Sequence, residues 1–144
     1  MILVPANATS EAGTLPDARQ LAEMGKYNQA LVEAGVLVAG EGLHPTSKGT
    51  RVTFDGTKAP TVVDGPFTES KDLIAGFWIF DVKSHAEAIE WIRKAPFGVM
   101  SGDRTTVEIR RIFSPEDFAP SDPTGELRAK EEELRERAAK QHAK

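Results

Sequence analysis

The 144-residue chain contains no cysteine. Disulfide bonds, zinc-thiolate sites, iron–sulfur clusters and thiol catalysis are therefore excluded. The three histidines, His44, His85 and His142, form no His-x-His or His-x-x-x-His pair, so we predict no metal site and no cofactor within one chain. Glycine-rich phosphate loops and the Gly-x-Ser-x-Gly turn of serine hydrolases are also missing.

Long apolar runs are absent as well. The longest, residues 74–80 counting one glycine, has seven residues, whereas a membrane-spanning helix needs about 20. The N-terminus places no basic residue before its apolar run, unlike a signal peptide. A net charge of −4 lacks the basic footprint that phosphate binding requires. We therefore expect a cytoplasmic protein that binds neither membranes nor nucleic acid.

What is present is ordinary globular composition, with 40% hydrophobic and 28% charged residues. A chain of this length suits one domain of usual size. Residues 126–144 hold eleven charged side chains, six basic and five acidic, and residues 114–123 hold three prolines, which is typical of a linker. We therefore divide the chain into a core domain at residues 1–113 and an appendage at residues 114–144, made of a proline-rich linker and a charged C-terminal helix.

Hydrophobic periodicity and local signals predict the elements of the core. Pro5 ends the first apolar run, which favours an edge strand, and Asp55-Gly56 predicts a hairpin turn. Ser84 and Glu87 match a capping box. In chain order, the predicted elements are a strand at 1–4, a loop at 7–13, a helix from Thr14, a strand at 36–39, a hairpin at 51–63, a strand at 73–82, a helix from Ser84 to Pro96 and a strand at 105–113.

This order predicts an α+β fold of the ferredoxin-like βαββαβ type with an inserted β-hairpin. Two helices would cover one face of an antiparallel sheet. Residues 77–80, Phe-Trp-Ile-Phe, supply apolar side chains to both faces, so the second face also needs a cover. A second copy of the chain is the simplest one, and we predict a homodimer.

The most distinctive motif is Asp64-Gly65-Pro66-Phe67, followed by Thr68, Glu69 and Lys71 and then by Gly76-Phe77. It resembles the DGPF branch of the YCII-related family, and the resemblance covers roughly residues 1–113. The resemblance implies a ferredoxin-like subunit that dimerises sheet to sheet as a dimeric α/β barrel. It implies no single reaction, and some members of the branch occur beside extracytoplasmic-function sigma factors.

One departure from the family matters for catalysis. YCII-type members resemble enzymes through a His–Asp dyad, and a few relatives are dehydrochlorinases of chlorinated hydroxyquinols. By spacing from Gly35 and Pro96, the dyad positions fall near Met24 and Ala95, which transfer no protons. That chemistry therefore does not carry over, and we assign no catalytic residue.

Three polar residues are candidates for ligand binding. Asp64 begins a turn, where its carboxylate either accepts backbone amides as an Asx-turn or anchors a ligand. Glu41 lies between Gly40 and Gly42 at a strand end, and its carboxylate either faces a ligand, pairs with an arginine or faces water. His44 follows that strand and is suited to acid–base work near neutral pH, or is a surface loop residue.

Aromatic residues complete the candidate site. Tyr27, the only tyrosine, either packs toward the sheet or lines a cleft from the first helix. Trp78 or its neighbour Phe77 would form an apolar floor, according to which side chain faces the site. Glu41, His44 and Asp64 either converge at one rim of the sheet above this floor or remain separate surface residues.

The C-terminal helix carries four glutamates, each four residues before a base: Glu126/Lys130, Glu131/Arg135, Glu133/Arg137 and Glu136/Lys140. Its apolar seam is narrow, with Leu127, Leu134 and Ala138. The helix is either solvated on all sides or an arm that packs along a partner subunit.

Three functions remain open from the sequence. The first is a homodimer that binds a small molecule in a sensing or regulatory role. The second is a small cofactor-independent enzyme of lyase or isomerase type that acts on an aromatic or enol metabolite. The third is an accessory protein that binds a regulatory protein such as a sigma factor.

Overall fold

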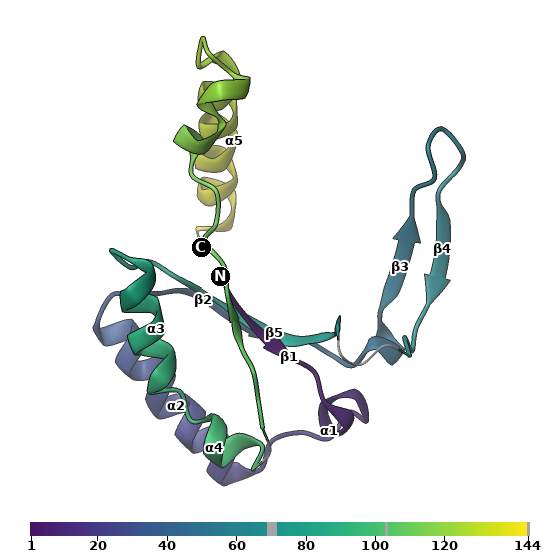
Figure 1. The fold of residues 1–144 in the computed structure, drawn as a ribbon, viewed down its shortest axis with the longest axis vertical. Helices are drawn as coiled ribbons and strands as arrows, with labels where there is room; N and C mark the ends of the chain where they lie inside the picture. The colour runs from purple at the N-terminus through teal and green to yellow at the C-terminus, as the bar shows by residue number, and fades with distance from the viewer. Residues whose placement is uncertain (69–71, 103, 144) are drawn as a thin grey trace. The chain divides into compact units, whose positions relative to one another are not determined.

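The computed structural model describes residues 1–68, 72–102 and 104–143 (Figure 1). The chain divides into two compact units, Met1–Arg110 and Arg111–Lys144. The first unit combines helices with antiparallel sheets, which confirms the α+β class. In the part of the chain that the structure describes, no helix is long and apolar enough to cross a bilayer.

Four strands form the main sheet of the first unit, in the spatial order β2-β5-β1-β6. All neighbouring pairs are antiparallel. A second, two-stranded sheet pairs β3 with β4. The strands are β1 (Ile2–Pro5), β2 (Leu37–Gly42), β3 (Thr50–Thr53), β4 (Thr61–Asp64), β5 (Ile74–Phe80) and β6 (Glu108–Ile109).

The position of β1 corrects the sequence-based expectation. Pro5 suggested an edge strand, but β1 lies between β5 and β6. Pro5 is its last residue, beyond a shift in register after Val4, so the missing amide of proline interrupts no bond in the middle of the ladder. Met1 extends the pairing with β6, because its amino group donates to the Arg110 carbonyl oxygen at 2.7 Å and its own carbonyl accepts from the Arg110 amide at 2.9 Å.

Of the last two predicted strands, one is confirmed and the other is much shorter than predicted. The strand predicted at residues 73–82 is confirmed as β5, Ile74–Phe80. The last strand was predicted to run through residues 105–113, but only Glu108–Ile109 pair with β1. Their partners are Leu3 and Ile2, respectively.

Local capping sets the helices. The predicted loop at 7–13 contains α1 (Ala8–Glu11), because the Asn7 and Ser10 side chains form a reciprocal capping box. Asp17 and Gln20 form another box, so α2 (Ala18–Glu33) begins later than the predicted Thr14. Other helices in the described part of this unit include the 3₁₀ helix η1 (Thr46–Lys48), α3 (His85–Arg93) and the single turn α4 (Phe97–Met100).

Of the two hydrogen bonds in the capping box predicted for α3, one is present and the other is replaced. Ser84 Oγ accepts the Glu87 amide at 3.1 Å, as expected. The Glu87 carboxylate, however, accepts the amide of Lys83 at 2.8 Å rather than that of Ser84. The helix start is therefore fixed by two side chain–backbone bonds in a shifted pattern.

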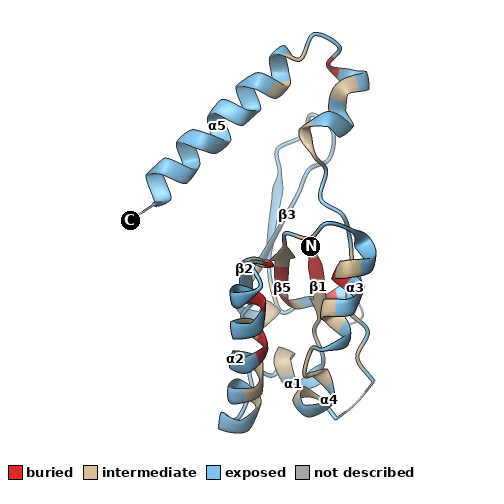
Figure 2. Cartoon of the chain, turned by 90° about the vertical axis from the view of Figure 1, so that its left-hand side faces the viewer, coloured by how far each residue is buried: buried red, intermediate tan, exposed pale blue. Residues whose placement is uncertain are grey.

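The core lies between the sheet and the helices α2 and α3, which occupy one side of it (Figure 1). The side chains of this core are buried, as the red segments of Figure 2 show for β1, β5 and α2. They come from both layers and comprise Ile2, Tyr27, Leu31, Val36 and Trp78. The indole of Trp78 is central, with the rings of Tyr27 and Phe97 edge-on at 5.7 and 6.0 Å between centroids.

The opposite face of the sheet has no helix over it among the described residues of the first unit (Figure 1). Successive residues of a strand point to opposite faces, so Phe77 and Ile79 point away from the side that Trp78 buries. Both are half-buried. We call this side of the four-stranded sheet the open face.

The β3–β4 hairpin projects from the main sheet (Figure 1). Every residue from 50 to 64 is exposed. Several of these side chains are apolar, and Val62 is 64% exposed. An isolated two-stranded hairpin is marginally stable in water at best, and no described residue of the first unit covers these side chains. The exposed apolar residues are Val52, Phe54, Val62 and Val63.

The second unit contains the 3₁₀ helix η3 (Pro115–Ser121) and α5 (Glu126–His142). The predicted linker at 114–123 is therefore wrong in its conformation, because Ser114 and Asp117 form a capping box and Pro115 fits the first helical turn. The Ser114 amide lowers the pKa of Asp117, followed by its hydroxyl and by Arg111.

Of the four predicted ion pairs in α5, two lie within 4.0 Å among the described residues. Glu131 contacts Arg135 at 3.7 Å, and Glu136 contacts Lys140 at 4.0 Å. Both pairs are largely exposed, so each adds a few tenths of a kcal/mol at most.

Candidate functional site

A row of four side chains crosses the open face. Leu3 lies opposite Phe77 on one side and opposite Glu108 on the other, and Phe77 lies opposite Glu41. Residues directly opposite each other in a sheet share a face. The row therefore reads Glu108, Leu3, Phe77, Glu41 from β6 to β2. It places two apolar side chains in the middle and a carboxylate at each edge.

The Glu41 carboxylate is exposed and, among the described residues, forms no hydrogen bond or ion pair. At the other end of the row, Glu108 contacts Arg110 at 3.6 Å. Glu41 is thus the carboxylate that remains available next to the Phe77 ring. Such a pairing suits a ligand with an apolar body and a hydrogen-bond donor or positive charge.

The glycines beside Glu41 are explained by packing on β5. A Cβ atom at Gly40 would lie 2.5 Å from Cδ1 of the Trp78 indole, on the core side of the sheet. A Cβ atom at Gly76, opposite Gly42, would lie 2.8 Å from the Glu41 carbonyl oxygen. The small residues therefore allow β2 to lie close to the Trp78 indole and to the backbone of β5.

The Asp64-Gly65-Pro66-Phe67 motif connects three segments of the first unit. Thr46 of η1 donates its hydroxyl to Glu11 Oε2 at 2.6 Å and accepts the Phe67 amide at 3.0 Å. The Thr46 amide also donates to Glu11 Oε1 at 3.2 Å. The Arg51 guanidinium lies 4.0 Å from the centroid of the Phe67 ring. The motif thus fastens the base of the hairpin to η1 and α1.

Asp64 takes part in this junction through a different bond from the expected one. Its Oδ1 accepts the Thr50 hydroxyl at 2.9 Å, across the first pair of the hairpin. An Asx-turn would need an amide two residues on, but Pro66 has none. The carboxylate is exposed and belongs to the two-stranded sheet, whereas Glu41 belongs to the four-stranded one.

His44 lies in the exposed loop between β2 and η1, three residues beyond Glu41. The preceding Leu43 still donates its amide to the Ala75 carbonyl oxygen at 2.7 Å, so the chain leaves the sheet only at His44. Glu41 and His44 are therefore neighbours along one strand end. Glu69 and Lys71, which belong to the sequence motif, lie outside the described residues.

Tyr27 and Trp78 lie in the core, on the face opposite Glu41. The Tyr27 hydroxyl donates to the Trp91 carbonyl oxygen at 2.9 Å, and Trp78 Nε1 donates to Asn28 Oδ1 at 3.1 Å. Burial raises the pKa of Tyr27 to about 12. The sequence left open whether Trp78 or Phe77 lies beneath the candidate site. Phe77 is the one that shares a face of the sheet with Glu41.

The positions that match the family's dyad are also packed. Met24 and Ala95 are both partly buried against the core cluster. Neither side chain transfers a proton, and neither borders Glu41 on the open face.

Sequence reasoning missed the junction of Glu11, Thr46 and Phe67. These residues are 35 and 21 positions apart, and no periodicity links such distant positions. It also missed Glu108, which lies between Val107 and Ile109 in the sequence and therefore points to the face opposite theirs. In the described residues, no group of three or more histidine or carboxylate side chains is arranged to hold a metal ion.

The comparisons with known proteins agree with the motif. The model of the YCII-related domain matches residues 1–114. A protein of Rhizobium meliloti (strain 1021), described as uncharacterized, is 30% identical over 87 residues, which are 60% of this chain and 69% of that protein. The family model thus spans the whole first unit, including the open face and the hairpin. The chain belongs to the YCII-related family.

Proposed function

We propose that this chain is a small-molecule-binding homodimer of the DGPF branch, in which two open faces meet as a dimeric α/β barrel. The strand order β2-β5-β1-β6, with α2 and α3 on one side, supports a ferredoxin-like subunit. The observation that carries the proposal is the open face itself. It presents Leu3, Phe77 and Ile79 half-buried in a single chain.

The hairpin supports the same arrangement. Its apolar side chains find no cover in their own unit, and a second copy would supply one. A two-fold pairing is self-complementary, so the hairpin of each copy and the open face of each copy would be covered together.

The ligand would lie between the two sheets, beside Glu41 and Phe77. A carboxylate without an internal partner next to an aromatic ring selects an apolar or aromatic molecule that carries a hydroxyl or amino group. His44, at the same strand end, would border the mouth of this cleft. The role would be sensing or regulatory, because the family's proton-transfer dyad is replaced by Met24 and Ala95.

One observation favours an enzyme as the second candidate. The Glu41 carboxylate lies among apolar neighbours, and such a group acts as a general base when a substrate covers it. The reaction would be a cofactor-independent elimination or isomerisation of an aromatic or enol metabolite. Turnover of a bound ligand, lost in Glu41→Gln with binding retained, would distinguish the enzyme from the binding protein.

The dimer is tested by light scattering and sedimentation. The expected mass is twice the 15.7 kDa of one chain, and Phe77→Glu should reduce it to that of one chain. Val32→Glu on the exposed side of α2 is the control, since Val32 is an exposed apolar residue outside the open face. Val62→Glu on the hairpin tests the interface should Phe77→Glu fail to fold. A wild-type monomer at micromolar concentration would contradict the proposal.

The binding site is tested by a metabolite-library thermal-shift screen. A ligand that binds only the folded protein raises the melting temperature. The shift should be lost in Glu41→Gln and retained in Glu116→Gln, which changes an exposed carboxylate of the second unit. A shift that persists in Glu41→Gln without any loss of turnover would place the ligand elsewhere, whereas a persistent shift with turnover lost is the result expected of the enzyme.

A further inference from the structure

The surroundings of Glu41 on the open face are apolar. In an antiparallel sheet, the neighbours of a side chain on its own face are the residues opposite and diagonal to it and those two positions away along its strand. Leu43 follows β2 but continues its pairing, because its amide donates to the Ala75 carbonyl oxygen at 2.7 Å. The neighbours of Glu41 are therefore Ala39, Leu43, Ala75, Phe77 and Ile79.

No base of the four-stranded sheet compensates the charge of Glu41. The strands β1, β2, β5 and β6, all of them described, contain neither lysine nor arginine. Arg110, which follows β6, contacts Glu108 at 3.6 Å and so neutralises the carboxylate at the other end of the row. In the described part of the open face, Glu41 therefore carries the negative charge that has no partner.

Covering the open face makes this charge unfavourable. An ionised carboxylate loses its hydration when apolar groups enclose it, and a positive group beside it offsets that loss. In the proposed homodimer, the second copy brings the same four-stranded sheet, which again offers no lysine or arginine from its strands. A ligand in the cleft is then the simplest source of the positive group.

The ring of Phe77 favours the same sign of charge. The face of an aromatic ring is negative and attracts cations. Directly opposite residues of an antiparallel pair have Cβ atoms about 5 Å apart, so one ammonium group can contact both the Glu41 carboxylate and the Phe77 ring. Leu3 is the next residue of the row, one strand spacing of about 4.8 Å further on. Phe77 and Leu3 together thus offer an apolar floor for the body of the same ligand.

We propose that the ligand of the open face is an organic cation. Its positively charged amino group would meet the Glu41 carboxylate, and its aromatic or alkyl body would lie over Phe77 and Leu3. This inference rests on the proposed homodimer and narrows its ligand, from a molecule that carries a hydroxyl or amino group to an amine.

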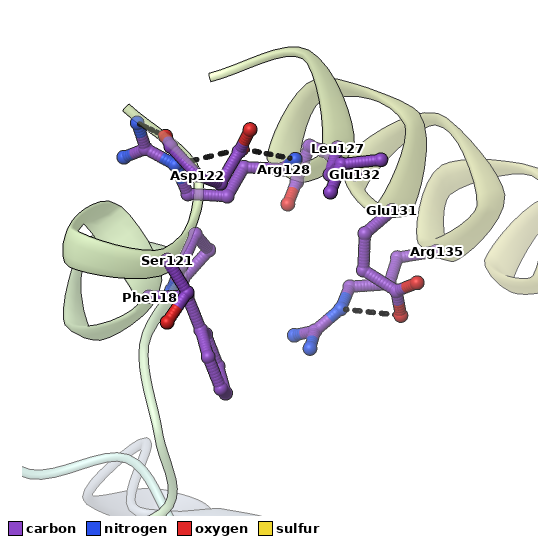
Figure 3. Close-up of a pocket in the computed structure, with 9 residues that line it drawn as sticks. Phe118, Ser121, Asp122, Leu127, Arg128, Glu131, Glu132 and Arg135 are labelled. Carbon is purple, nitrogen blue, oxygen red and sulfur yellow. Dashed lines mark hydrogen bonds and ion pairs between the residues drawn. The ribbon is translucent and has the colours of Figure 1, made fainter. Parts of the chain in front are cut away.

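A groove of about 380 Å³ between η3 and α5 is a second place where a cation can collect (Figure 3). Asp122 pairs with Arg128 and also accepts its amide at 3.0 Å, and Glu131 pairs with Arg135. Glu132 also lines the groove and has no ion pair among the described residues. It is therefore the matched comparison for Glu41.

The experiment is an NMR titration of the full chain at pH 7 with three probes. 2-Phenylethylamine is positive, 2-phenylethanol is neutral and 3-phenylpropionate is negative, and all three share a phenyl ring on a two-carbon chain. The amine should bind at least about tenfold more tightly than the propionate, with the alcohol in between. The amide signals that move should be those of β2 and β5.

Glu41→Gln removes the charge and keeps the size of the side chain. It should weaken the binding of 2-phenylethylamine about tenfold and change that of 2-phenylethanol by less than about twofold. Glu132→Gln is the matched control and should leave the binding of the amine unchanged. Loss of amine binding in Glu132→Gln, with binding retained in Glu41→Gln, would place the cation in the groove of the second unit and overturn the proposal.

Sedimentation equilibrium gives a second readout that needs no probe. Without a cation, Glu41→Gln should lower the dissociation constant of the dimer, because a neutral amide is less unfavourable to cover than a carboxylate. 2-Phenylethylamine should strengthen the dimer of the wild type and not that of Glu41→Gln. A weaker dimer in Glu41→Gln would show that a base of the second copy already pairs with Glu41, which would overturn the proposal.

The inference and the proposed function fail in different ways. A monomeric wild-type chain contradicts the homodimer. A dimer that binds the three probes with equal affinity contradicts the cationic ligand alone. If none of the probes binds, the dimer of Glu41→Gln decides, because a dissociation constant equal to that of the wild type would show that the charge of Glu41 needs no partner.

Discussion

The carbonyl oxygen of Thr46 occupies the space that a side chain at Gly65 would need. A Cβ atom at position 65 would overlap this oxygen, which belongs to backbone and has no rotamer to change. The Gly65 amide also donates to the Gly49 carbonyl oxygen at 2.9 Å. The glycine of the Asp64-Gly65-Pro66-Phe67 motif is therefore required by close approach of η1 and the end of the hairpin.

Gly65→Ala should lower the free energy of unfolding by about 1–3 kcal/mol or more, because backbone must move to admit the methyl group. Denaturant unfolding measures this change. Gly25→Ala is the control, since Gly25 is in the middle of α2 and a Cβ there meets nothing within 4 Å. The control should raise the free energy of unfolding by about 0.5–1 kcal/mol. Equal stability of Gly65→Ala and wild type would refute the close approach.

The two hydrogen bonds of the Thr46 hydroxyl should contribute about 1–3 kcal/mol to the free energy of unfolding. Thr46→Val leaves the Phe67 amide without its acceptor and Glu11 Oε2 without its donor, while the Thr46 amide still donates to Glu11 Oε1. Thr53→Val, on the exposed hairpin, should change stability by less than about 0.5 kcal/mol. A double-mutant cycle with Glu11→Gln should be non-additive, because the two side chains share one bond. Additive effects would mean that the junction contributes no coupling.

Elements with strong local signals were predictable from the sequence. The apolar and β-branched run at β5 and the Ser84 cap of α3 needed no knowledge of the rest of the chain. The single turn α1 was missed because its signal, the Asn7 and Ser10 capping box, lies in an otherwise polar segment. The proline-rich stretch at 114–123 was misread because Pro115 begins a helical turn as readily as it breaks one.

The candidate site was predictable only in part. The position of Glu41 at the end of a strand followed from local pattern, but its face did not, because that depends on the register that sets it opposite Phe77. The partners of Thr46 and of Asp122 are likewise fixed by tertiary packing. Periodicity cannot reveal such contacts, since they join segments whose spacing in the chain obeys no repeat.

Tyr27 should titrate as a buried phenol. It is the only tyrosine of the chain, so the rise in phenolate absorbance near 295 nm reports this group alone. Burial raises its pKa from 10.0 to about 12. Because the folded state favours the neutral phenol, its contribution to the free energy of unfolding is fully present below pH 10. This contribution is lost as the pH rises toward 12. Titration of the folded protein near pH 10 would contradict the burial of this ring.

Truncation after Phe113 should leave the first unit folded. The bonds that end its sheet, between Met1 and Arg110, lie within the retained chain, and the core residues from Ile2 to Trp78 all belong to it. The near-ultraviolet circular dichroism of Trp78, whose indole is held edge-on by Tyr27 and Phe97, should therefore persist. The sedimentation mass should remain that of a dimer, because the open face is unchanged. Loss of the near-ultraviolet signal would show that the second unit stabilises the first, and a folded monomer would show that the dimer forms through α5 rather than through the sheet.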